Sequence, residues 1–325
     1  MRLPPLNPVL ARELKQRMRG RLTWLVLTAY LGLLALILRV VMAGVARFSG
    51  AELGNPFASA AVGRSVFGWL LFFMLILVCF IVPGLTAAAI SSERERRTLT
   101  SLQVTLLPAR SIVLGKILAS LSFVLLLVVA SVPLLSVPFL VGGVSLGEMV
   151  RGVTMVLVAA VTIGCIGVAV STSLRRTQAA TVVTYGLTLF LVLGTLMVYG
   201  AQRAFDRSER MSSPAVLALN PFVATADVVR GRQGPFDGLP SPFSALQALL
   251  DSHTVQPDVA VASDQPGQLV APDGPAPEPE APARVKVAGL PFWAASLAMS
   301  GLLAAGAFAL AVRRITLPTT RERAG

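Results

Sequence analysis

The residues best suited to chemistry lie in one short stretch, which reads Ser-Ser-Glu-Arg-Glu-Arg-Arg-Thr-Leu from Ser91. A lipid-active enzyme would need acidic groups such as Glu93 and Glu95 clustered near a membrane surface for acid–base work. The neighbouring arginines favour a simpler interpretation, in which the two acids belong to a solvated, helix-stabilising face. We therefore expect no catalytic residue in this stretch.

Other reactive groups are scarce. One histidine, His253, and two cysteines, Cys79 and Cys165, leave almost nothing for a histidine-based metal site, a catalytic triad or a disulfide scaffold. A Walker A motif needs a lysine followed by serine or threonine, and none of the three lysines has that neighbour. We expect no metal, no cofactor and no nucleotide hydrolysis in this chain, so its energy comes from a partner or an ion gradient.

The elements that must position these residues are membrane helices. The 325 residues are 54% hydrophobic and 14% charged, whereas soluble chains carry about 25% charged residues. Six runs contain no charged residue, and they are 17, 28, 31, 23, 26 and 26 residues long. Because a helix needs about 20 apolar residues to cross a bilayer, the first run must continue past Arg39, whose long side chain reaches toward the membrane surface.

These runs predict an all-α membrane protein with six transmembrane helices, at about 22–46, 66–90, 112–140, 152–174, 177–200 and 287–312. If the N-terminus is inside, the cytoplasmic segments contain 17 Lys and Arg residues and the outer segments contain nine. The outer count leaves out the centre of the long fifth connection. This bias predicts that both termini are cytoplasmic. The net charge of +12 then reflects topology and anionic lipid rather than nucleic acid, and we expect a bacterial plasma membrane.

The first cytoplasmic segment, 1–21, has the pattern of a basic amphipathic helix lying in the membrane interface. Three apolar residues recur at helical spacing and three basic residues fall on other faces: Leu10, Leu14 and Met18, and Arg12, Lys15 and Arg19. The alternative is a simple positive anchor for the first span. The tail, 313–325, is also expected to be cytoplasmic.

The connection 91–111 predicts a short charged helix. Ser91 or Ser92 is expected to cap it, and an apolar stripe that includes Leu99 and Leu102 follows before Pro108 ends the helix. Such a stripe needs either a cytoplasmic protein partner or the lipid surface.

The long connection between spans five and six divides into two parts. Segment 201–255 contains two starts of short amphipathic helices, at Asn220-Pro221 and Ser241-Pro242, which we expect at the outer mouth. Segment 256–286 is rich in proline, alanine and acids, and we expect a disordered linker.

Two spans contain small or polar residues. Gly164, Gly167 and Ser171 in span four predict close helix packing. In span five, Thr181, Thr184, Tyr185 and Thr188 are candidates for lining a pathway, although helix packing explains them equally well.

Two stretches resemble a known family, the ABC-2 type transporter permeases. Asn7–Arg21 resembles the N-terminal elbow helix of that family. Ser92–Lys116 resembles its loop between spans two and three, with a Glu-Arg-Glu-Arg-x-Thr-Leu core, a Leu-Pro turn and a closing Ile-Val-Leu-Gly-Lys. Arg97 stands where a glycine is common, and Thr100 where an acid is common.

The resemblance implies the membrane subunit of an ABC transporter, with export the commoner direction. It implies that the helix in 91–111 is a coupling helix for a separate ATP-binding subunit, which holds ATP and Mg²⁺, and that a second, identical or different permease completes the pathway. The residues that would dock are Glu93, Arg94, Glu95, Arg96, Arg97, Thr98, Leu99 and Leu102. The alternatives are an ion-coupled secondary transporter, made less favourable by the scarcity of ionisable groups in the spans, and a non-transporting accessory membrane protein.

Overall fold

The computed structural model describes residues 21–48, 56–95, 109–205, 215–230, 241–251, 285–287 and 289–316. Six of its helices are long and apolar enough to cross a membrane: Trp24–Gly44, Ala60–Glu95, Arg110–Val141, Leu146–Ser173, Thr177–Phe205 and Phe292–Ile315. The prediction of an all-α membrane protein with six transmembrane helices is therefore confirmed.

Some helices extend well beyond the charge-free runs of the sequence. The spans lie in α2 (Arg21–Phe48), α3 (Pro56–Thr86), α6 (Ala109–Val141), α7 (Leu146–Ser173), α8 (Thr177–Leu189) and α13 (Phe292–Thr316). Helix α3 continues through a turn into α4 (Ser91–Glu95), and α8 continues through a π-helical turn, η1 (Phe190–Gly194), into α9 (Thr195–Phe205). Arg64, which bounds the second charge-free run, therefore lies inside α3. Near this end of the helix its side chain still finds a partner, since Arg64 Nη2 donates a hydrogen bond to Gly143 O at 3.1 Å.

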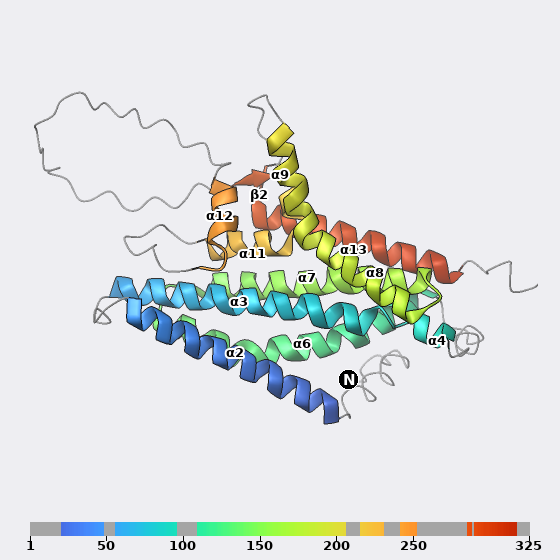
Figure 1. Cartoon of the computed structure of the whole chain (residues 1–325), viewed down its shortest axis with the longest axis horizontal. Helices are drawn as coiled ribbons and strands as arrows, with labels where there is room; N and C mark the ends of the chain where they lie inside the picture. Colours follow the sequence, from blue (N-terminus) through green and yellow to red (C-terminus); the bar gives the residue numbers. More distant parts are fainter. Residues whose placement is uncertain are drawn as a thin grey trace, which may run out of the picture.

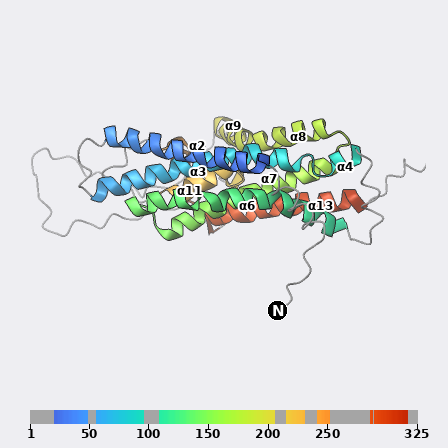
Figure 2. The same cartoon turned by 90° about the horizontal axis from the view of Figure 1, so that it is seen from below.

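Helices α3 and α7 form the centre of the bundle, and Figure 1 shows α2 and α6 on one side of them and α8 and α13 on the other. In the turned view of Figure 2, α2 and α8 lie along one edge of the bundle and α6 and α13 along the other. In the most apolar part of each span, 56% of residues are buried in α3 and 61% in α7, against 17% in α2 and α13. The core includes Phe67, Leu71 and Met74 of α3 and Val156 and Ile163 of α7. The outer helices expose apolar side chains, as surfaces in contact with lipid tails do.

Small residues let α7 approach its neighbours closely. A Cβ added to Gly152 would lie 2.6 Å from Leu71 Cδ1, and one added to Gly167 would overlap Thr86 Oγ1 on α3. A Cβ on Gly164 would lie 3.3 Å from Leu121 Cδ2 of α6. The small residues of span four therefore lie at helix crossings, as close packing requires.

The connection between α6 and α7 lies at the end of the bundle opposite α4. Gly142 and Gly143 have φ values of 101° and 83°, which favour glycine. Ser145 and Glu148 then form a capping box, in which each side chain accepts a hydrogen bond from the other residue's backbone N–H. This short turn makes α6 and α7 antiparallel neighbours.

A group of short elements, which we call the α9–α12 cluster, packs beside the bundle (Figure 1). It contains α9, α10 (Ala215–Ala218), α11 (Pro221–Val229), α12 (Ser244–Asp251) and the antiparallel strands β1 (Lys286–Val287) and β2 (Leu290–Pro291). Tyr199, Leu217, Leu250 and the first residue of α13, Phe292, form its separate small core.

Helix α11 lies where the sequence predicts a short amphipathic helix, and it is buried on nearly all sides. It begins where expected, since Asn220 caps it and Pro221 takes its first position. All of its residues except Asp227 are buried, however. The physical reason is that α11 contacts α3, α7, α12 and α13, so neighbours cover the whole helix rather than one side.

Candidate functional site

The candidate site is the end of the bundle where α3 turns into α4 and the loop begins. Residues 87–90 form the turn. Ser91 and Ser92 do not cap α4: their hydroxyls donate to Ala87 O at 3.1 Å and Ala88 O at 2.6 Å, four residues earlier. Backbone hydrogen bonds continue through the turn, so few N–H groups need a cap. The predicted serine cap is therefore wrong, and α4 extends α3.

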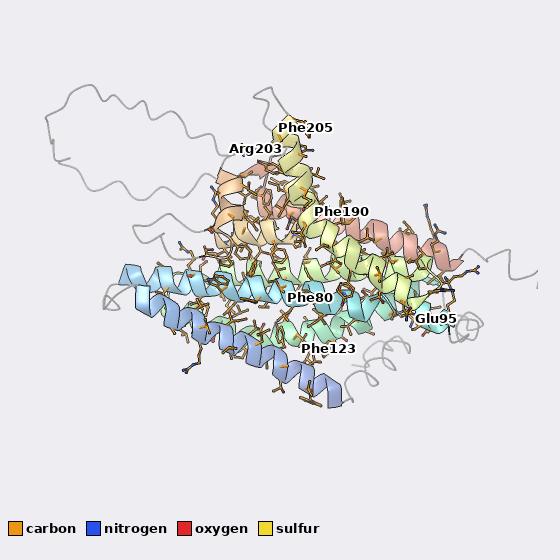
Figure 3. All side chains as sticks on the ribbon, viewed as in Figure 1. Phe80, Glu95, Phe123, Phe190, Arg203 and Phe205 are labelled. Carbon is orange, nitrogen blue, oxygen red and sulfur yellow. The ribbon has the colours of Figure 1, made fainter. Side chains whose placement is uncertain are left out.

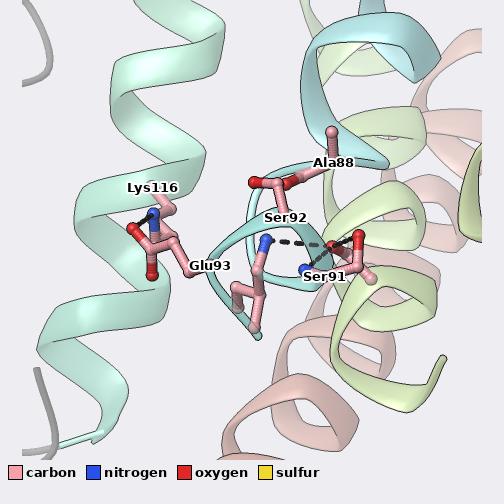
Figure 4. Close-up of polar contacts among 7 residues, drawn as sticks. Ala88, Ser91, Ser92, Glu93 and Lys116 are labelled. Atoms are coloured by element: carbon pink, nitrogen blue, oxygen red, sulfur yellow. Dashed lines mark hydrogen bonds and ion pairs between the residues drawn. The ribbon is translucent and has the colours of Figure 1, made fainter. Parts of the chain in front are cut away.

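A serine of α7 holds the turn between α3 and α4. Ser171 Oγ accepts hydrogen bonds from the backbone N–H groups of Ile90 and Ser91, each at 3.0 Å, and donates to Ser91 Oγ at 3.3 Å (Figure 4). All three residues are buried. The close crossing at Gly167, one helical turn earlier, brings α7 near enough for these bonds.

An ion pair joins α4 to α6. Lys116 Nζ lies 2.8 Å from Glu93 Oε1, and the two side chains are 4% and 25% exposed (Figure 4). Desolvating two charges offsets much of their attraction, so a buried pair adds little net stability. Removing one partner is costly, however, because the other charge stays buried. The pair therefore fixes the position of α4 against α6 more than it stabilises the fold.

A carboxylate of α4 caps the start of α8. Glu95 Oε1 accepts from the backbone N–H of Thr177 at 2.7 Å, and Glu95 Oε2 accepts from Thr177 Oγ1 at 2.8 Å. The α8 N-cap residue, Arg176, supplies no side-chain cap of its own. A negative charge is favourable at a helix N-terminus, so Glu95 replaces the missing cap. Figure 3 shows Glu95 at this end of the bundle, far from Arg203 and Phe205 at the end of α9.

Three longer helices thus hold one five-residue helix. Helix α4 is bonded to α6 through Glu93 and to α8 through Glu95, while α7 holds the turn before it through Ser171. Residues 96–108 follow Glu95 in the chain. The turn and α4 are therefore joined to three membrane helices through short polar contacts.

Several predicted site residues lie outside the described residues. These are Arg96, Arg97, Thr98, Leu99 and Leu102 of the loop, and the interface residues Leu10, Arg12, Leu14, Lys15, Met18 and Arg19. The predicted linker, 256–286, is described only at 285 and 286. Arg94 is described; it is half-buried and continues the helix by donating its N–H to Ile90 O.

The four candidates for pathway lining follow one another along α8. Thr181, Thr184 and Thr188 each donate their hydroxyl to the carbonyl four residues earlier, and Thr184 and Thr188 are buried. Tyr185 Oη donates to Phe80 O of α3 at 2.7 Å. The threonine bonds stay within α8 and the Tyr185 bond joins α8 to α3, and a pathway role stays a prediction.

Three residues of this arrangement were not predicted as site residues from sequence. The sequence predicts Ser171 only as a small packing residue and Lys116 only as the end of a motif, and it assigns Thr177 no role. A partial signal existed for Thr177, since the helix start Arg-Arg-Thr contains a weak cap at best. Among the described residues, no group of three or more His, Cys, Asp or Glu is arranged to hold a metal ion.

The chain was compared with known proteins and protein families. The family model described as "ABC-2 family transporter protein" matches residues 8–234, a range that includes every described element from α2 to α11 and the loop after α4. No curated protein matches the chain. The matched range covers well over half of the sequence, and the six spans agree with a permease. The chain therefore belongs to the ABC-2 family of transporter proteins, as a multi-pass membrane permease subunit of an ABC transporter.

Proposed function

We propose that this permease is driven by a separate ATP-binding subunit that docks from the cytoplasm on the loop 91–111. ABC-2 permeases in general work with an ATP-binding subunit. The observation that carries the proposal is the triple attachment of the turn and α4 to α6, α7 and α8. ATP and Mg²⁺ then belong to the partner, and this chain is not itself an enzyme.

The charge distribution supports a cytoplasmic position for the α4 end. Basic residues gather where α4, α6, α8 and α13 have their ends: Arg94, Arg110, Lys116, Arg175, Arg176, Arg313 and Arg314. Lys and Arg near span ends favour the cytoplasmic side. It supports our proposal that both termini are cytoplasmic, and we propose a bacterial plasma membrane as the location.

The proposed mechanism is a lever. ATP binding and hydrolysis in the partner move the docked loop, and α4 passes the movement to α6 and α8 through Glu93 and Glu95. Because packed helices switch between discrete arrangements, the helices tilt as units and open the pathway to one side or the other. A second permease subunit, identical or different, completes the pathway, and export is the direction we propose.

An ion-coupled mechanism has less support. Such carriers usually keep ionisable groups at membrane depth. In the described spans, the Asp, Glu, Lys and Arg residues lie toward the helix ends, with Lys116, Arg39 and Arg151 the furthest inside. Lys116 is already paired with Glu93. The centres of the described spans therefore offer no relay of carboxylates.

The test is ATPase stimulation and assembly in the reconstituted complex, after co-purification and mass spectrometry identify the ATP-binding subunit. Changing Leu99→Asp together with Leu102→Asp is expected to abolish both, because a charge on the apolar stripe prevents docking. Leu290→Asp, at an exposed leucine of β2, is the matched control and should leave both intact. Normal stimulation and assembly with the loop variant would refute the docking proposal.

A further inference from the structure

Span five is interrupted near its middle. In η1, Thr195 N–H donates to Phe190 O, five residues back rather than four. The helix changes direction here, with α9 rising more steeply than α8 (Figure 1), and the exposed ring of Phe190 marks the junction (Figure 3). A π-turn of this kind loosens the regular hydrogen-bond ladder and is frequent at functional sites.

One side chain from another helix occupies this interruption. Asn220 is 0% exposed, and its Nδ2 donates to Val192 O at 2.7 Å and to Thr195 Oγ1 at 2.9 Å. Its Oδ1 accepts from the N–H groups of Phe222 and Val223, at the start of α11. Both donor positions of the Asn220 Nδ2 group and both acceptor positions of its Oδ1 are therefore occupied.

The network continues within span five. Thr195 Oγ1 donates to Leu191 O at 2.9 Å while it accepts from Asn220. A buried backbone carbonyl needs a partner, and Val192 O finds one in Asn220. A fully satisfied buried network of this kind specifies one arrangement of the elements that it joins. Here it joins the π-turn of span five to α11.

We infer that Asn220 is a positioning residue of the transport cycle, which passes movement of α8 to α11 and the α9–α12 cluster. The inference rests on the proposed function, since it requires α4 to move α8. The two contacts lie at opposite ends of α8: Glu95 binds its first residue, and Asn220 binds the turn after its last. The 13 residues of α8 make a rod about 20 Å long.

Two substitutions separate this role from simple capping. Asn220→Asp keeps an oxygen for the N–H groups of α11 and removes the amide donors that reach span five. Thr195→Val removes the hydroxyl from the other side with little change in shape, and it tests the same link if the first variant fails to fold. Gln247→Met is the matched control, because Gln247 Nε2 donates to Ala226 O within the cluster and not to span five.

The experiment measures distances by pulsed electron paramagnetic resonance in the reconstituted complex, with Cys79 and Cys165 replaced by alanine. One label pair, Gln178 and Leu114, reports the α4 end; the other, Ala245 and Leu140, reports α12 against the far end of α6. All four positions are exposed. Spectra are compared between the nucleotide-free complex and the complex trapped with ATP and vanadate.

In the unsubstituted complex, we expect both distances to shift on trapping. Asn220→Asp and Thr195→Val should keep the shift of the α4-end pair and lose at least half of the shift of the α12 pair. The distances in the nucleotide-free complex should stay unchanged in both variants. Gln247→Met should keep the shifts of both pairs. Full shifts of the α12 pair in both variants, or no α12 shift without substitution, would overturn the inference. If the α4-end pair does not move without substitution, the proposed lever itself fails, which is a distinguishable result.

Discussion

The two ends of α8 are held by different chemistry. At its start, an exposed carboxylate, Glu95, caps the helix, and the buried Glu93–Lys116 pair lies nearby. After its end, the contacts are made by a neutral amide and a neutral hydroxyl, Asn220 and Thr195, both buried. Charged contacts near water respond to salt and to an approaching partner, whereas buried neutral bonds do not. The two ends of α8 should therefore differ in how strongly salt affects their contacts.

The largest expected effect comes from breaking the ion pair. Lys116→Met leaves the Glu93 carboxylate without this cation in a partly buried site, which should lower the free energy of unfolding by about 3–5 kcal/mol. Unfolding is followed in mixed detergent–SDS micelles by tryptophan fluorescence. Adding Glu93→Leu should recover most of the loss, because no buried charge then remains. If the free energy of unfolding of Lys116→Met alone lies within about 1 kcal/mol of that of the original chain, the Glu93–Lys116 pair is not desolvated.

The close crossing of α7 and α3 gives the next effect. Gly167→Ala places a methyl group where Thr86 Oγ1 already lies, and overpacking of this kind should cost about 2–3 kcal/mol in the same assay. Gly186→Ala is the control, since nothing lies within 4 Å of a Cβ at that position. Equal stability of the two variants would mean that α3 and α7 are not in close contact.

Thr195→Val tests the neutral end. It leaves Asn220 Nδ2 with one acceptor fewer, and an unsatisfied buried donor should cost about 1–2 kcal/mol. Because no charge is involved, the loss should be the same at about 0.05 M and about 0.5 M NaCl. A loss that shrinks with salt would contradict the contrast between the two ends.

The smallest effect belongs to the exposed cap. Glu95→Gln removes the negative charge from the start of α8 and keeps an oxygen acceptor. The thermal midpoint of the variant should therefore lie slightly below that of the original chain at low salt, and the difference should disappear at high salt. Glu148→Gln is the matched control, since that acid caps α7 at the opposite end of the bundle. A salt-independent change would show that charge is not what Glu95 contributes.

Sequence predicted the spans well because membrane insertion depends on local composition. The charge-free runs identified all six helices, and Asn220-Pro221 identified the start of α11, since caps and first-turn prolines act within a few residues. The nearly complete burial of α11 was not predicted, because the pattern of one helix does not show how many neighbours surround it.

The site was harder to predict for the same reason. Glu95 and Thr177 are 82 positions apart, and Ile90 and Ser171 are 81 apart, so their pairing follows only from how α3, α7 and α8 pack. The acids of α4 were identified from sequence, but their partners were not. A serine such as Ser171 gives no distinctive signal, because small polar residues serve packing and hydrogen bonding alike.

The burial of Lys116 has a practical consequence. It is one of three lysines in the chain and only 3% exposed, with its ammonium group against Glu93. An amine-reactive acylating reagent therefore modifies it only in molecules in which α4 has separated from α6. The extent of acylation at this one position, read by peptide mass, therefore measures the fraction of molecules in which α4 has separated from α6.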